Sequence, residues 1–67
     1  MLRILSKEEI KSLEMQGKIA FISLWDTIEK AKDYYDTLTH RYYAYQQDPT
    51  ELTHAFSTPV KVYKLIE

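Results

Sequence analysis

A short stretch in the middle of the chain carries the residue types best suited to chemistry. Asp36 and His40 are four residues apart, which places both side chains on one face of a helix. A carboxylate and an imidazole at this spacing can bind a metal ion or orient an imidazole ring, but they also occur together on ordinary solvated faces. The chain has no cysteine, and its other histidine, His54, belongs to a different segment. We therefore expect no metal site and no cofactor.

The sequence lacks the local motifs of common catalytic sites. It contains no glycine-rich phosphate loop, no HExxH metal motif and no nucleophile elbow. Scattered serines, histidines and carboxylates occur in any globular protein. A domain of 67 residues also has little room for a deep substrate pocket. We therefore expect that the protein is not an enzyme.

Five tyrosines between positions 34 and 45 are the most conspicuous feature of the sequence. On a helix, most of them join a stripe of apolar residues at spacings of three and four. The stripe consists of Phe21, Leu24, Ile28, Ala31, Tyr35, Leu38, Tyr42 and Tyr45. The opposite face is polar and carries Asp26, Asp33, His40 and Gln47. We expect the tyrosines of the stripe to be buried in the core, each with its hydroxyl at a polar edge.

Two of the five tyrosines fall outside the stripe. Tyr34 lies about 70° from its centre, and Tyr43 lies near the polar face. Tyrosine is a frequent interface anchor because its ring is large, stiff and amphipathic, and arginine is another common anchor. Arg41 is close to both tyrosines in the sequence. The residues we expect to bind a partner are Tyr34, Arg41 and Tyr43.

The charge pattern limits the class of partner. Nine basic residues are nearly balanced by ten acidic ones, and the balance also holds within each part of the chain. Non-specific binding to nucleic acid depends on clustered lysine and arginine, so the balance favours a protein partner. A small nucleic-acid-binding protein that uses the Tyr, Lys and Arg residues of the central helix is the alternative.

The first helix is marked by signals at both ends. Ser6 and Glu9 form a capping box, with Leu5 and Ile10 at the positions of a hydrophobic staple. Gly17 is suited to the left-handed conformation that follows a helix. We expect a helix over residues 7–16 that ends at Gly17.

The central segment is predicted to be one long amphipathic helix over residues 20–47. Asp26 and Glu29 are spaced as a second capping box inside this range. That spacing leaves an alternative open, in which residues 18–25 form a strand that leads into a helix capped by Asp26. We favour the helix because Phe21 and Leu24 stay in phase with the stripe.

The remaining segments are a short helix and two extended ends. Asp48, Pro49 and Glu51 provide the cap, the first helical position and the third for a helix that ends near Phe56. Residues 1–5 and 60–67 are rich in β-branched and aliphatic side chains, which favours strands. We expect these two terminal strands to pair with each other or with a second chain.

These elements predict a single small domain over residues 1–67. Its class is α+β and mostly helical, with a long amphipathic helix packed against a short N-terminal helix and short terminal strands. A chain of this size without disulfides often gains stability by oligomerising or by docking on a partner. We expect a small protein–protein interaction module, a regulator or inhibitor that binds a larger protein and/or self-associates. The sequence shows no signal peptide and no membrane span, so we expect a cytoplasmic protein.

Overall fold

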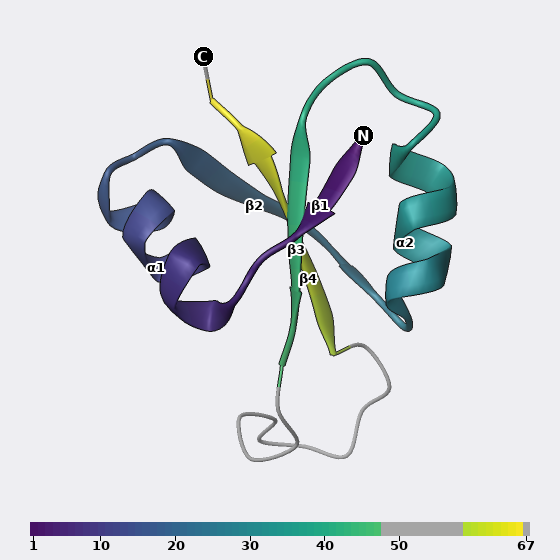
Figure 1. The fold of residues 1–67 in the computed structure, drawn as a ribbon, viewed down its shortest axis with the longest axis horizontal. Helices are drawn as coiled ribbons and strands as arrows, with labels where there is room; N and C mark the ends of the chain where they lie inside the picture. The colour runs from purple at the N-terminus through teal and green to yellow at the C-terminus, as the bar shows by residue number, and fades with distance from the viewer. Residues whose placement is uncertain (48–58, 67) are drawn as a thin grey trace.

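A four-stranded mixed sheet forms the centre of the molecule (Figure 1). The computed structural model describes residues 1–47 and 59–66. The strands lie in the order β1-β3-β4-β2, with β1 parallel to β3 and the other two pairs antiparallel. In chain order, the elements are β1 (Leu2–Ile4), α1 (Lys7–Met15), β2 (Ile19–Trp25), α2 (Ile28–Tyr35), β3 (Tyr42–Gln46) and β4 (Val60–Leu65).

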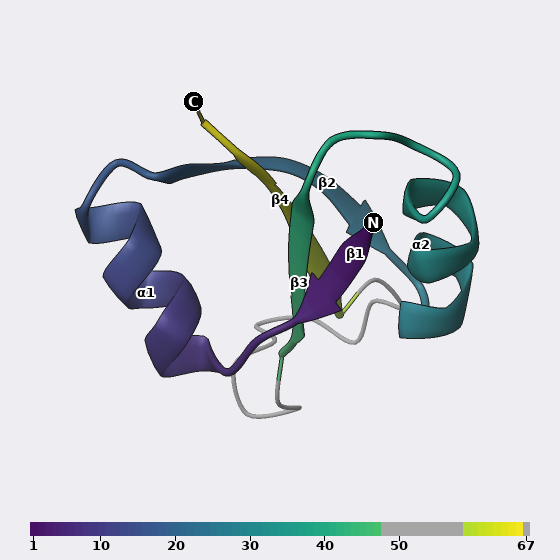
Figure 2. The same ribbon diagram turned by 45° about the horizontal axis from the view of Figure 1, so that its top comes forward.

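The two helices cover opposite faces of the sheet, as Figure 2 shows. The sheet therefore has apolar side chains on both faces, and each helix closes its own cluster. The cluster beneath α2 is made of Leu2, Ala31, Tyr35, Tyr42, Ala44, Val60 and Val62. The cluster beneath α1 is made of Ile10, Ile19, Tyr45 and Tyr63. Burial of these side chains provides the main force that holds the two layers of helix against the sheet.

The prediction of a mostly helical fold with one long helix over residues 20–47 is wrong. The segment divides into β2, the eight-residue helix α2 and β3. The alternative, a strand over residues 18–25 that leads into a helix, describes its first half. The error has a physical origin: a strand that carries apolar residues on both faces is apolar at successive positions, so it also satisfies spacings of three and four.

Helix α2 ends at Tyr35 because its last carbonyl groups find other partners. The Thr37 hydroxyl donates a hydrogen bond to the Tyr34 carbonyl oxygen at 2.6 Å. The amino nitrogen of Met1 donates to the carbonyl oxygens of Tyr35, Leu38 and His40 at 3.0–3.1 Å. A positive charge is favourable at the C-terminal end of a helix, so this contact also fixes the start of β1 beside α2.

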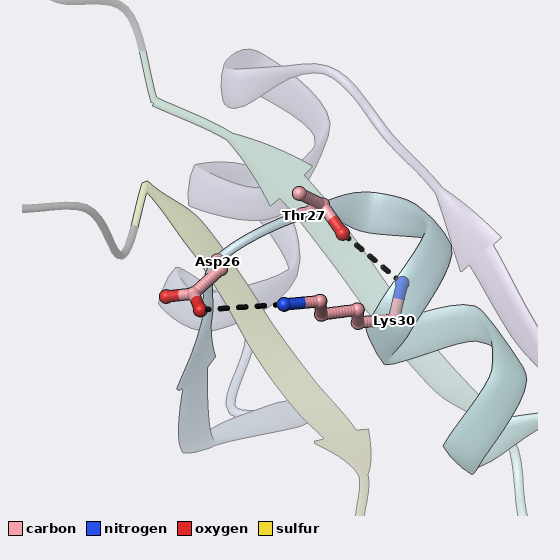
Figure 3. A network of polar contacts seen from close by, with 3 residues as sticks. All are labelled: Asp26, Thr27 and Lys30. Carbon is pink, nitrogen blue, oxygen red and sulfur yellow. Dashed lines mark hydrogen bonds and ion pairs between the residues drawn. The ribbon is translucent and has the colours of Figure 1, made fainter.

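The start of α2 differs by one residue from the alternative prediction, in which Asp26 caps the helix (Figure 3). The cap is Thr27, whose side-chain oxygen accepts a hydrogen bond from the Lys30 backbone nitrogen at 3.2 Å. Asp26, which was expected to cap, instead lies 3.8 Å from the Lys30 ammonium as an exposed ion pair. Threonine and aspartate both serve as caps, and the adjacent residues of the sequence do not distinguish them.

The signals of the first helix are confirmed. Ser6 accepts a hydrogen bond from the Glu9 backbone nitrogen at 3.3 Å, and the Glu9 carboxylate accepts one from the Ser6 backbone nitrogen at 3.2 Å. Helix α1 ends at Met15, and Gly17 has a φ of 70°. Local hydrogen bonds alone decide these ends, which is why the sequence pattern was sufficient.

The two terminal strands exist, but they do not pair with each other. β1 pairs with β3, and β4 lies between β3 and β2. β4 is a central strand with Val60 and Val62 in the α2 cluster and Tyr63 in the α1 cluster. The predicted third helix, which was to end near Phe56, lies outside the described residues.

Candidate protein-interaction surface

Strand β2 is an outer strand with an unusually apolar exposed surface. Among the described strands, only β4 pairs with it. Phe21, Ile22 and Leu24 are 49%, 42% and 48% exposed. Outer strands of natural sheets usually carry charged residues or proline, which prevent another chain from pairing with them. The seven residues from Ile19 to Trp25 contain neither, so this edge of the sheet is suited to contact with another chain.

The hydrogen bonds of β4 show which backbone groups of β2 point outward. Leu65 donates to the Arg41 carbonyl, and Gln47 donates to the Pro59 carbonyl, so the odd-numbered positions of β4 bond to β3. The even-numbered positions therefore face β2, because bonding direction alternates along an antiparallel strand. The residues of β2 that lie opposite odd-numbered positions direct their backbone N–H and C=O groups to the open edge; they are Ile19, Phe21 and Leu24.

A break in register within β2 determines how its side chains divide between the two faces. The register with β4 shifts between Phe21 and Ser23, so Ile22 is an extra residue. Phe21 lies opposite Tyr63, and Leu24 lies opposite Lys61, which places both on the face that α1 covers. The Phe21 ring meets the Tyr63 ring edge to face, with centroids 5.7 Å apart.

On the other face, Ser23 and Trp25 lie opposite Val62 and Val60, beneath α2. The Ser23 hydroxyl is 2.7 Å from the Tyr35 hydroxyl, and it accepts a hydrogen bond from the Trp25 indole nitrogen at 2.9 Å. These contacts hold the half-buried Trp25 ring in one orientation before any partner arrives. A fixed aromatic ring loses little conformational entropy on binding.

Tyr34 extends the apolar area of β2 onto helix α2. Its ring lies 5.6 Å from the Trp25 ring with the two planes tilted by 32°. Tyr34 is 53% exposed. The outer strand and the adjacent helix thus expose apolar side chains along this edge, on both faces of the sheet. We call these side chains the β2 surface: Phe21, Ile22, Leu24, Trp25 and Tyr34.

Charges of opposite sign stand at the two ends of β2. Lys18 precedes the strand and Asp26 follows it, and both are exposed. The residues between them are uncharged. The β2 surface is therefore apolar at its centre and charged at its rim, as in the interfaces of protein complexes.

The structure separates the three residues that the sequence proposed for partner binding. Tyr34 belongs to the β2 surface. Tyr43 is half-buried and packs against the α1 cluster, on the opposite face of the sheet. Arg41 is exposed at the start of β3 and, with Tyr43 and Arg3, lines a shallow hollow. Partner binding by Arg41 and Tyr43 stays a prediction, and neither residue belongs to the β2 surface.

Sequence reasoning missed Phe21, Ile22 and Leu24 as contact residues. Phe21 and Leu24 were placed in the buried stripe of a helix, and Ile22 was given no role. The signal was present in the apolar residues from Ile19 to Trp25, which only Ser23 interrupts. Only the strand order, however, shows that this run lies at the edge of the sheet rather than at its centre.

The expected pairing of Asp36 with His40 on one helical face does not occur. Asp36 follows the last residue of α2, and its carboxylate accepts a hydrogen bond from the Leu2 backbone nitrogen at 2.9 Å. His40 lies beyond the helix, in the connection to β3. Within residues 1–47 and 59–66, no three His, Cys, Asp or Glu side chains are grouped so that they would hold a metal ion.

Comparison of the chain with protein-family models, with curated proteins and with solved structures finds no match. The candidate site therefore depends on the geometry of this chain alone. In the described part of the chain, no helix has the length and apolar character needed to cross a membrane.

Proposed function

We propose that the protein is a small protein–protein interaction module. It acts as a regulator or inhibitor of a larger protein, and it uses the β2 surface for partner binding, self-association or both. The observation that carries this proposal is the outer strand β2, which exposes three large apolar side chains beside outward-directed backbone groups. A cysteine-free chain is compatible with a reducing compartment, and we place this role in the cytoplasm.

The mode of recognition that fits this surface is strand addition. An extended segment of the partner hydrogen-bonds to the open edge of a sheet, and alternate side chains provide the specificity. On β2, the backbone groups of Ile19, Phe21 and Leu24 are available for such a ladder. Trp25 and Tyr34 lie beside it and supply aromatic contacts of the kind that dominate binding energy.

The nucleic-acid alternative loses its structural premise. It required tyrosines and basic residues along one long helix, whereas α2 has eight residues and its two lysines share the helix with Glu29 and Asp33. Tyr42, Tyr43 and Tyr45 belong to β3, and two of them are buried. We therefore carry only the protein-interaction proposal forward.

The proposal is tested by quantitative capture of proteins on the immobilised full chain. The test variant is Phe21→Thr/Leu24→Thr, because threonine retains the β-propensity of the strand while it removes the large apolar side chains. The matched control is Met15→Thr, which changes an exposed apolar residue of α1. A captured partner should bind wild type and the control with similar affinity, and it should bind the Phe21→Thr/Leu24→Thr variant at least about tenfold more weakly. Equal binding of that purified partner to all three chains would contradict the proposal.

A further inference from the structure

The open edge of β2 accepts only certain strands in certain registers. A hydrogen-bonded pair across this edge must join outward-directed backbone groups, which belong to Ile19, Phe21 and Leu24. Side chains that lie opposite each other must also share a face of the sheet. These two conditions decide whether β2 can pair with an antiparallel copy of itself.

One self-pairing satisfies both conditions on either side of the irregularity at Ile22. With Phe21 opposite Leu24 of the second copy, the two-fold axis generates the same hydrogen-bonded pair twice. Both residues lie on the α1 face, so their side chains meet across the edge. The neighbouring positions also match, because Ala20 and Trp25 lie opposite Lys64 and Val60 and therefore share the α2 face.

Neighbouring registers do not satisfy both conditions. With Phe21 opposite Phe21, Ile19 would lie opposite Ser23, and these two residues are on different faces of the sheet. With Ile19 opposite Phe21, the faces match but Leu24 extends past the end of the paired segment and stays exposed. The irregularity at Ile22, which interrupts an ordinary partner strand, is matched in the first register by the same irregularity in the second copy.

The charges at the ends of β2 also favour a second copy as the occupant. Phe21 opposite Leu24 places Lys18 opposite Thr27 of the second copy, next to Asp26 of that copy. The two-fold axis produces this opposite-charge contact at both ends of the paired strands. An exposed ion pair adds little affinity, but opposite charges at both ends set orientation and register.

We infer that two copies of this chain associate through antiparallel pairing of their β2 strands, with Phe21 opposite Leu24 of the second copy. The inference rests on the proposed function and names the second copy as the occupant of the β2 surface. The two sheets become one continuous sheet, with both α1 helices on one face and both α2 helices on the other. The pairing covers Phe21 and Leu24 and satisfies the outward backbone groups of these two residues in both strands.

The register is tested by disulfide trapping, for which the natural absence of cysteine is an advantage. Full-length Phe21→Cys and Leu24→Cys, distinguished by mass, are mixed and oxidised. Directly opposite residues have Cα atoms about 5.5 Å apart, within the range of a disulfide. The mixture should give the crosslinked heterodimer, at least about tenfold above either variant alone, because like positions lie about 10 Å apart along the strands. Crosslinking of Phe21→Cys with itself to the same extent would overturn the register.

Association itself is tested by sedimentation of Leu24→Glu over a wide concentration range. Leu24 is half exposed and lies opposite Lys61, so the glutamate gains an opposite charge within its own sheet and the fold is retained. In the dimer it would face the Phe21 ring of the second copy. Wild type and Met15→Glu should have similar dimer dissociation constants. The dissociation constant of Leu24→Glu should be at least about tenfold higher. A wild-type monomer at high micromolar concentration would overturn the inference.

The failure of this inference is distinguishable from failure of the proposed function. If the chain is monomeric but captures another protein through Phe21 and Leu24, the dimer inference is wrong and the proposed interaction function stands. A monomer whose captured proteins bind the Phe21→Thr/Leu24→Thr variant equally well overturns both. A trapped Phe21–Leu24 heterodimer supports both.

Discussion

The Ser23 hydroxyl of β2 and the Tyr35 hydroxyl of α2 lie 2.7 Å apart beneath the outer edge of the sheet. The same Ser23 oxygen accepts a hydrogen bond from the Trp25 indole at 2.9 Å. Tyr35 is buried, and its ring also contacts those of Trp25 and Tyr34 at centroid distances of 5.7 and 4.9 Å. One small hydroxyl thus joins the outer strand to the helix and orients the aromatic half of the β2 surface.

Removal of that hydroxyl should destabilise the domain. In Ser23→Ala, the Tyr35 hydroxyl and the Trp25 indole lose a common partner in a partly buried site, which costs about 1–3 kcal/mol. Denaturant unfolding followed by fluorescence measures the change, because Trp25 is the single tryptophan of the chain. The control is Ser12→Ala, which removes an exposed hydrogen bond to Gln16 and should be nearly neutral. Equal stability of Ser23→Ala and wild type would show that this contact does not secure β2 to α2.

The tyrosines should divide into structural and surface residues. Tyr42 is buried with its ring 4.5 Å from that of Tyr35, so Tyr42→Ala should lower the free energy of unfolding by about 3–5 kcal/mol. Tyr34 is 53% exposed, so Tyr34→Ala should cost less than about 1 kcal/mol and weaken partner binding instead. Thermal melts and capture assays on both variants separate the two effects. A strongly destabilised Tyr34→Ala would contradict this division.

The burial of individual side chains was predictable, whereas the element that carries them was not. Tyr35, Tyr42 and Tyr45 are buried as the apolar stripe predicted. Yet Tyr42 and Tyr45 belong to β3 and face different helices, since one lies in the α2 cluster and the other in the α1 cluster. Burial depends on the composition of a short segment. The choice between helix and strand depends on pairing with distant residues, which a single sequence does not display.

The candidate surface, likewise, could not be predicted from local sequence patterns. The signals of α1, Ser6 and Gly17, involve contacts a few residues apart and were predicted correctly. The exposure of Phe21 and Leu24 depends on the strand order, in which β4 separates β2 from β3. No local pattern encodes that order. Tyr34 was proposed because it lay outside the stripe. Its contact with the Trp25 ring depends on the packing of α2 against β2, which the sequence pattern did not indicate.

Gly17 should be the most sensitive residue of the turn after α1. Its φ of 70° is a conformation that residues other than glycine rarely adopt. Within the described residues, apart from its two neighbours in the chain, nothing lies within 4 Å of a methyl group added at its Cα. The cost of Gly17→Ala is therefore confined to the backbone, at about 1 kcal/mol. Gly17→Asn should cost less, because asparagine tolerates this conformation better. Urea unfolding of both variants checks the order, and an asparagine variant less stable than the alanine variant would contradict it.

Tyr63 should make the domain less stable in strongly alkaline solution. Burial, followed by the charge of Glu14, raises the pKa of the Tyr63 phenol to about 12, compared with about 10 in an unfolded chain. Between these values the unfolded chain loses the proton first, so stability falls as pH rises from about 10 to about 12. Below about pH 10 the phenol is protonated in both states and contributes no slope.

The variant Tyr63→Phe isolates this effect from the other tyrosines. It retains the ring that meets Phe21 and removes only the titrating hydroxyl. The free energy of unfolding of wild type should therefore decrease more steeply than that of Tyr63→Phe above about pH 10, and the two curves should run parallel below it. Tyr34→Phe serves as the control for loss of a tyrosine hydroxyl at an exposed position, because that ring is 53% exposed. Parallel curves for wild type and Tyr63→Phe up to about pH 12 would show that the Tyr63 phenol titrates alike in the folded and unfolded states.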